Sequence, residues 1–109
     1  MTVDIAHPPL SGLAAEQLLD ESLRSVRGSS GLRILRIIHG YGSTGKGGTL
    51  KTVVQNWCYK KRTQLRAVVS GEDATPFNEE ARAMAAECGI SIASDLGPAN
   101  DGMTIVWIA

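Results

Sequence analysis

The chain is poor in aromatic residues, which make up 5% of its 109 residues, and it has two cysteines. No apolar run approaches the roughly 20 residues that a membrane-spanning helix needs. The first residues lack the basic-then-apolar pattern of a signal peptide. Cys58 and Cys88 lack the spacing of a metal site, so we interpret them as reduced thiols in the core. These absences argue against a membrane protein and favour a cytoplasmic one.

Acidic residues are missing from one long part of the chain, although the net charge is zero. Residues 22–71 contain no Asp or Glu, whereas the flanks hold all eleven acids and one basic residue, Arg82. The basic residues of this acid-free stretch are Arg24, Arg27, Arg33, Arg36, Lys46, Lys51, Lys60, Lys61, Arg62 and Arg66. Such a stretch attracts a polyanion locally while the whole molecule stays neutral. The alternative is that these side chains are ordinary solvated charges.

The most informative segment follows an apolar run at residues 32–38. His39 comes next, and residues 40–48 contain five glycines, two hydroxyl residues and a lysine. Glycine costs backbone entropy, so a loop that only connects two elements would not need so many. A strand, a glycine loop and a helix together aim backbone N–H groups at an anion. We predict a phosphate-binding site with Arg36, Gly40, Tyr41, Gly42, Ser43, Thr44, Gly45, Lys46 and Lys51 as its candidate contacts.

Apolar periodicity predicts the helices and strands. The expected strands are residues 2–6, 32–38, 64–70, 90–93 and 103–108. The expected helices are residues 11–27, about 50–61 and 75–88. The order β-α-β-α-β-α-β-β predicts an α/β (α+β) two-layer sandwich in one domain spanning residues 1–109. Its sheet would be mixed, with four or five strands and two or three helices, and Trp57 and Trp107 would lie in the core.

The third helix has the clearest start and stop signals. Thr75 is the predicted N-cap and Pro76 the first helical residue. Phe77 and Met84 are expected on its buried face. Gly89 is expected to end it.

One motif in the glycine loop is that of nucleotide hydrolases. Residues 40–46 fit the pattern G-x-x-x-x-G-K after a strand and before a helix. Gly47 stands where that motif needs Ser or Thr to hold magnesium, and Asp95 is the only weak candidate for its later acid. A nucleotide-phosphate binder is therefore kept only as an alternative.

A second pattern begins at the histidine. Residues 37–42 are an apolar strand ending in His-Gly-x-Gly, and Gly-Lys-Gly, a leucine and Trp57 follow. This arrangement resembles the small MutS-related (Smr) domain. Residues 3–7 resemble that family's Leu-Asp-Leu-His-Gly segment, except that Ala6 is inserted and Pro8 replaces the glycine. Residues 102–108 resemble its closing glycine and strand. The resemblance implies binding of nucleic acid, and in several members endonuclease activity on DNA or RNA.

The resemblance also implies roles for individual residues. His39, Gly40 and Gly42 fall on the family's loop and Asp4 on its acid, whereas His7 transfers only if the inserted residue is accommodated. His39 is a candidate general acid or base because histidine titrates near neutrality; the alternative is a structural histidine that bonds backbone and caps the glycine turn. Asp4 is a candidate to orient a histidine or to help hold a divalent metal, and no other cofactor is predicted. For His7 the alternative is an exposed turn residue.

These observations predict an Smr-like nucleic-acid-binding domain and candidate endonuclease. Its expected partner is structured DNA or RNA, and no interaction with a membrane is expected. A non-catalytic nucleic-acid or protein interaction module is the alternative from another class, because the segment at residues 3–7 departs from the family pattern.

Overall fold

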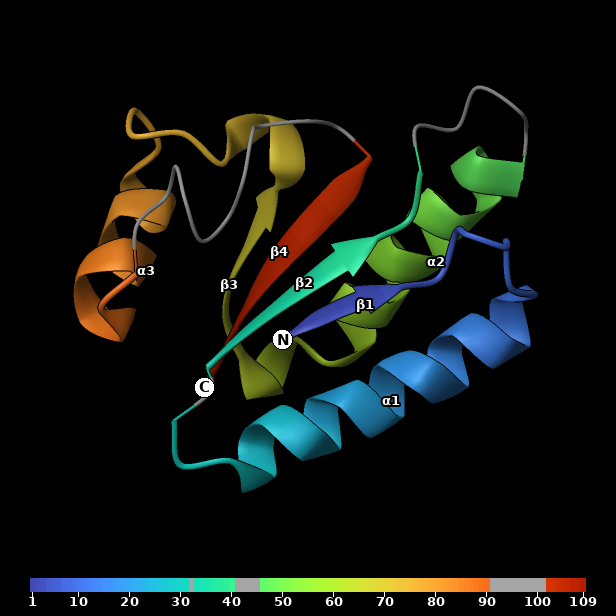
Figure 1. The fold of residues 1–109 in the computed structure, drawn as a ribbon, viewed down its shortest axis with the longest axis horizontal. Helices are drawn as coiled ribbons and strands as arrows, with labels where there is room; N and C mark the ends of the chain where they lie inside the picture. The colour runs from blue at the N-terminus through green and yellow to red at the C-terminus, as the bar shows by residue number, and fades with distance from the viewer. Residues whose placement is uncertain (32, 41–45, 91–101) are drawn as a thin grey trace.

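The computed structural model describes residues 1–31, 33–40, 46–90 and 102–109 (Figure 1). It is an α+β fold in which a mixed four-stranded sheet packs with three α-helices. The strands are β1 (Thr2–Asp4), β2 (Ile34–Ile38), β3 (Leu65–Ser70) and β4 (Met103–Ile108). The helices are α1 (Gly12–Gly28), α2 (Lys46–Lys60) and α3 (Glu79–Cys88), with short 3-10 helices η1 (Arg62–Gln64) and η2 (Gly71–Asp73). The predicted α+β fold with a mixed sheet is confirmed.

The last strand of the chain lies inside the sheet. The strand order is β1-β2-β4-β3. β1 runs parallel to β2, whereas β4 is antiparallel to both β2 and β3. All six residues of β4 are buried, because this central strand is covered on both faces. That burial explains why its sequence is a nearly continuous apolar run.

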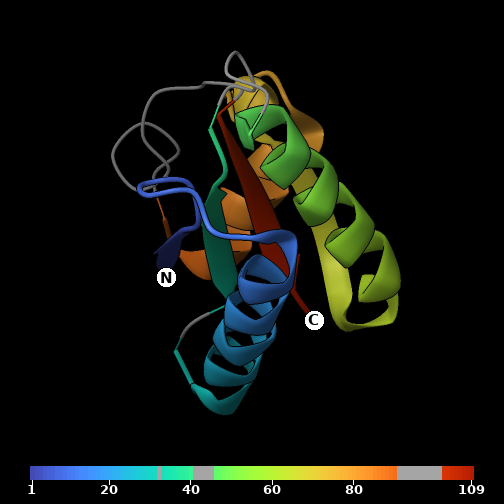
Figure 2. The same ribbon diagram turned by 90° about the vertical axis from the view of Figure 1, so that its right-hand side faces the viewer.

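Helices cover both faces of the sheet (Figures 1 and 2). α1 and α2 lie side by side on one face, and α3 lies on the other face near β3. The core under α1 and α2 includes Leu19, Leu23, Leu35, Ile37, Leu50, Val54, Trp57, Val106 and Ile108. The core on the α3 face includes Val69, Met84, Met103, Ile105 and Trp107. Both tryptophans are therefore buried, as predicted.

The predicted start of α3 is wrong. The N-cap is Asn78, whose side-chain Oδ1 accepts a hydrogen bond of 2.8 Å from the Ala81 N–H. The Thr75 hydroxyl instead accepts from the Phe77 N–H at 3.3 Å within a preceding turn. Phe77 therefore lies before the helix, and it is 92% exposed rather than buried. Gly89 ends the helix as predicted, with a left-handed φ of 66° that suits glycine.

Some predicted features fall on residues that the structure does not describe. These are the glycine-loop residues 41–45, most of the strand expected at residues 90–93, and Asp95. In the described part of the chain, no helix is long and apolar enough to cross a membrane.

Candidate functional site

The C-terminal ends of β1 and β2 meet at one edge of the sheet, where β4 begins. Parallel pairing places Asp4 beside Ile38. The backbone N–H groups of His39 and Gly40 both donate to the carbonyl oxygen of Gly102, at 2.9 and 3.0 Å. This edge therefore brings together three segments that are far apart in the sequence. The carboxyl ends of parallel strands are where ligands bind in open α/β sheets.

His39 is fully buried at this edge. Its Nδ1 lies 2.9 Å from the Gly40 carbonyl oxygen, and its Nε2 lies 2.9 Å from Oγ1 of Thr104. Because a carbonyl oxygen only accepts, Nδ1 is the donor, and in the neutral ring Nε2 accepts from the Thr104 hydroxyl. Gly40 has a φ of 81°, which glycine adopts without strain. The ring thus ties the first turn of the glycine loop to β4, which matches the structural alternative.

Asp4 and His7 form an exposed pair at the same edge. The His7 Nδ1 lies 2.9 Å from Oδ2 of Asp4 and 3.1 Å from Oδ1. The Asp4 Oδ1 also accepts from the N–H groups of Ala6, at 2.8 Å, and His7, at 3.1 Å. A carboxylate only accepts, so Nδ1 carries a proton, and in the neutral ring Nε2 is the basic nitrogen. The His7 side chain is 68% exposed and that of Asp4 39%.

The environment of Asp4 favours its charged form. Partial burial raises the pKa of this carboxyl group, but the hydrogen bond from the Ala6 N–H and the hydrogen bond and charge of His7 lower it. The net result is a pKa below the usual value. Asp4 therefore remains a carboxylate that can hold His7 in one orientation.

The sheet separates the Asp4 side chain from the His39 ring. Val3 and Ile37 pack into the core under α1 and α2. Side chains alternate along a strand, so Asp4 lies on the α3 face. Thr104 pairs with Ile37 and faces α2, and His39 contacts Thr104. Asp4 therefore contacts a histidine, but that histidine is His7 rather than His39.

Two basic residues predicted to bind phosphate lie apart. Arg36 lies on the α3 face, half-buried, and its Nε donates to Sδ of Met103 at 3.2 Å. Lys51 is half-buried on α2, which begins at Lys46 directly after the glycine loop. The N-terminal end of α2 therefore points toward the edge where β2 ends (Figure 1). A helix N-terminus favours an anion.

The fold partly cancels the charge separation seen in the sequence. Three basic residues of the acid-free stretch pair with acids from the flanking segments, a long-range result that no local pattern signals. The pairs are Lys60–Glu16 at 2.8 Å, Lys61–Asp20 at 3.2 Å and Arg66–Glu87 at 3.0 Å.

The described residues do not provide a complete ligand set for a divalent metal. They contain no group of three or more His, Cys, Asp or Glu side chains that could hold an ion. At the edge of the sheet, Asp4 and His7 supply two ligands, and both Asp4 oxygens already contact His7. Among the described residues, the exposed titratable groups at this edge are therefore the carboxylate of Asp4 and the imidazole of His7.

Comparison with known proteins places the chain in a family. Residues 9–83, more than half of the chain, match the family model described as the Smr domain. The crystal structure of the Smr domain of Thermus thermophilus MutS2 has the same fold, with a TM-score of 0.62 and 20% sequence identity over 99% of this chain and 96% of that one. No individual curated protein matches significantly. The chain therefore belongs to the Smr domain family.

Proposed function

We propose that this chain binds nucleic acid at the sheet edge formed by β1, β2 and β4, and that it cleaves phosphodiester bonds there. Membership of the Smr family, whose domains bind nucleic acid, supports the binding part of this proposal. The N-terminal end of α2, which begins soon after Gly40, lies at this edge and favours a phosphate group. Lys51, one and a half turns into α2, adds a positive charge.

The observation that carries the proposed chemistry is the Asp4–His7 pair at 2.9 Å. Nε2 of His7 would take the proton from the attacking hydroxyl group or water as its oxygen bonds to phosphorus. The P–O bond to the leaving oxygen then breaks, and that oxygen takes a proton from solvent. The Asp4 carboxylate would keep the ring oriented and stabilise the imidazolium that forms. The developing charge on the phosphate would be stabilised by Lys51 and by the helix N-terminus.

His39 has a different role in this proposal. Its ring is buried and both nitrogens contact protein groups. It would position the Gly40 turn and leave proton transfer to His7. The nuclease thus has one positioning histidine under α2 and one reacting histidine at the exposed edge.

The test is a combined binding and cleavage assay on labelled RNA and on linear and branched DNA, with and without divalent metal. The unmutated protein is compared with His7→Ala and Asp4→Asn, and with Glu21→Gln as a control for the loss of an exposed acid on α1. We expect His7→Ala to lower the cleavage rate by about 10² to 10⁴-fold, the usual contribution of a general base. Binding should change less than twofold.

Three outcomes would contradict parts of this proposal. Binding without cleavage in the unmutated protein would reject the nuclease and favour the non-catalytic interaction module. Cleavage that is unaffected by His7→Ala would reject the role of the Asp4–His7 pair. Stabilisation by ATP and magnesium, without nucleic-acid binding, would favour the nucleotide-phosphate alternative.

A further inference from the structure

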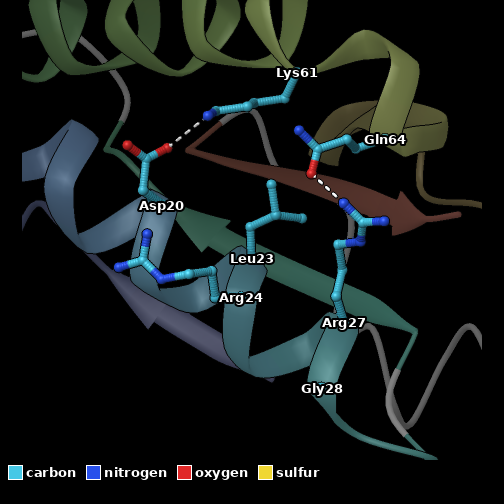
Figure 3. Close-up of a pocket in the computed structure, with 7 residues that line it drawn as sticks. All are labelled: Asp20, Leu23, Arg24, Arg27, Gly28, Lys61 and Gln64. Carbon is cyan, nitrogen blue, oxygen red and sulfur yellow. Dashed lines mark hydrogen bonds and ion pairs between the residues drawn. The ribbon is translucent and has the colours of Figure 1, made fainter.

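A groove of about 480 Å³ lies at the opposite end of α2 from the glycine loop (Figure 3). It is formed by the second half of α1, the C-terminal end of α2 and η1. The buried side chain of Leu23 lies at its centre, and polar side chains surround it (Figure 3). The lining residues are Asp20, Leu23, Arg24, Arg27, Gly28, Lys61 and Gln64.

The only acid in the lining is already engaged. Asp20 Oδ1 accepts a hydrogen bond of 2.9 Å from Nε1 of Trp57 and pairs with Nζ of Lys61 at 3.2 Å. The hydrogen bond from Trp57 and the contact with Lys61 hold the pKa of Asp20 below its usual value despite partial burial. Asp20 therefore stays charged and holds Lys61 in place at the edge of the groove.

The cations of the groove come from α1 and from Lys61, the residue that follows α2. Arg27 on α1 donates to Oε1 of Gln64, which links α1 to η1 (Figure 3). Arg24 is exposed and, among the described residues, forms no hydrogen bond or ion pair. It lies close enough to Asp20 to lower the pKa of that carboxyl group. The net charge of the groove is therefore about +2, because three cationic side chains face one carboxylate. The cations are Arg24, Arg27 and Lys61, and the carboxylate is Asp20.

The partial negative charges at the C-terminal ends of α1 and α2 do not neutralise this net positive charge. The C-terminus of a helix carries about half a negative charge, so α1 and α2 together need about one cation. The groove therefore retains a surplus of about one positive charge in a concave site. Such a site fits one phosphate group of a polyanion.

The groove is connected to the sheet edge through α2. Gly12 lies against Val53, and Asp20 pairs with Lys61, so α1 and α2 run side by side in the same direction. The fifteen residues of α2 span about 22 Å at about 1.5 Å per residue. A duplex rises by about 3.4 Å per base pair, so this span corresponds to roughly six or seven base pairs.

We propose that the groove is a second phosphate-binding site, which holds the backbone of the same nucleic acid about 22 Å from the N-terminal end of α2. The proposal rests on the proposed nucleic-acid binding and adds a minimum length to the ligand. Arg24 and Lys61 contact the phosphate, and Arg27 sets the width of the groove through Gln64.

The test measures binding by fluorescence anisotropy to RNA and DNA hairpins with stems of roughly 4 to 16 base pairs. Arg24→Gln is compared with Arg82→Gln, which removes the same charge from an exposed position of α3 on the other face of the sheet. We expect Arg24→Gln to weaken binding about threefold to fivefold for stems longer than about seven base pairs and to lower the salt slope by about one. Short stems and the Arg82→Gln variant should show no change.

A third variant separates this proposal from the proposed function. Lys51→Gln should weaken binding at every stem length, because Lys51 would contact the phosphate at the N-terminal end of α2. If Arg24→Gln matches Arg82→Gln at every length while Lys51→Gln weakens binding, the groove proposal is overturned and nucleic-acid binding stands. If the unmutated protein binds no hairpin, both are overturned. Poly-glutamate that competes as well as a long hairpin would also overturn the groove as a nucleic-acid site.

Discussion

The burial of His39 makes its replacement a test of the fold before it is a test of chemistry. His39→Ala removes a fully buried ring, the hydrogen bond to the Gly40 carbonyl and the hydrogen bond with Thr104. Each hydrogen bond contributes about 1 kcal/mol net, and the lost packing adds about 1 kcal/mol or more. The free energy of unfolding should therefore fall by about 3 kcal/mol. For a chain of this length, that corresponds to a melting temperature lower by about 13 °C.

The matching change on the other side of the contact is Thr104→Val. It removes the hydroxyl group that faces Nε2 of His39 and should cost about 1 to 2 kcal/mol. The double variant should cost about 1 kcal/mol less than the sum of the two single changes, because the shared hydrogen bond is lost only once. Thr104→Ser, which keeps the hydroxyl group, should show little coupling loss. Urea unfolding followed by the fluorescence of the buried Trp57 and Trp107 measures the four variants and the unmutated protein.

Two results would refute this reasoning. The first is a His39→Ala protein within about 0.5 kcal/mol of the unmutated one, the range of ordinary surface changes. The second is full additivity of His39→Ala and Thr104→Val. If the expected loss is found, a cleavage defect in His39→Ala has to be measured well below its melting temperature. Otherwise unfolding would be mistaken for a lost catalytic group.

Three further predictions follow from the described contacts. Asp4 has a lower pKa in the folded state than its ordinary value of 3.8, so its contribution is present above that value and is lost as the pH falls through the folded pKa; the free energy of unfolding of Asp4→Asn, measured in urea, should differ from that of the unmutated protein at pH 6, and the two values should converge in acid. A difference that stays constant with pH would contradict this. Asp20→Ala should cost about 1 to 2 kcal/mol and alter the tryptophan emission, because Nε1 of Trp57 loses its acceptor; an unchanged urea midpoint would argue against the contact. Burial raises the pKa of Cys58 to about 11, so in a Cys88→Ser background a thiol reagent at pH 8 should label Cys58 only as fast as the protein unfolds; rapid labelling of the folded protein would disprove its burial.

Sequence patterns predicted those helices and strands whose signals lie within the segment itself. The apolar stripe after Ser11 predicted α1, and the structure shows Ser11 as its N-cap, with a hydrogen bond of 3.2 Å from the Ala14 N–H. The start of α3 failed because two capping side chains lie three residues apart. Thr75 and Asn78 both offer an oxygen to a helix start, and Asn78 makes the cap while Thr75 closes a turn. Propensity alone does not decide between them.

The candidate site depended on pairings that a local pattern does not contain. The family resemblance of residues 3–7 made Asp4 a candidate to orient a histidine, but the choice between His7 and His39 follows from strand alternation and from the parallel register of β1 and β2. The pairing of Lys61 with Asp20 joins α1 to the residue that follows α2, and only the tertiary fold defines the relative placement of these two segments. The acid-free stretch therefore overstated the positive field along α2, and the groove beside Arg24 was not visible in the sequence.

The central place of β4 also sets the order in which the protein can form during synthesis. β1 and β2 leave the ribosome early, yet β2 lacks one neighbour and β3 lacks its only described partner until residues 103–108 emerge. Until then the apolar faces of α1, α2 and β3 have no complete sheet to cover. Loss of β4 by an early stop would remove the middle of the sheet and not an edge, so we expect such a chain to be a substrate for chaperones and proteases rather than a smaller folded domain.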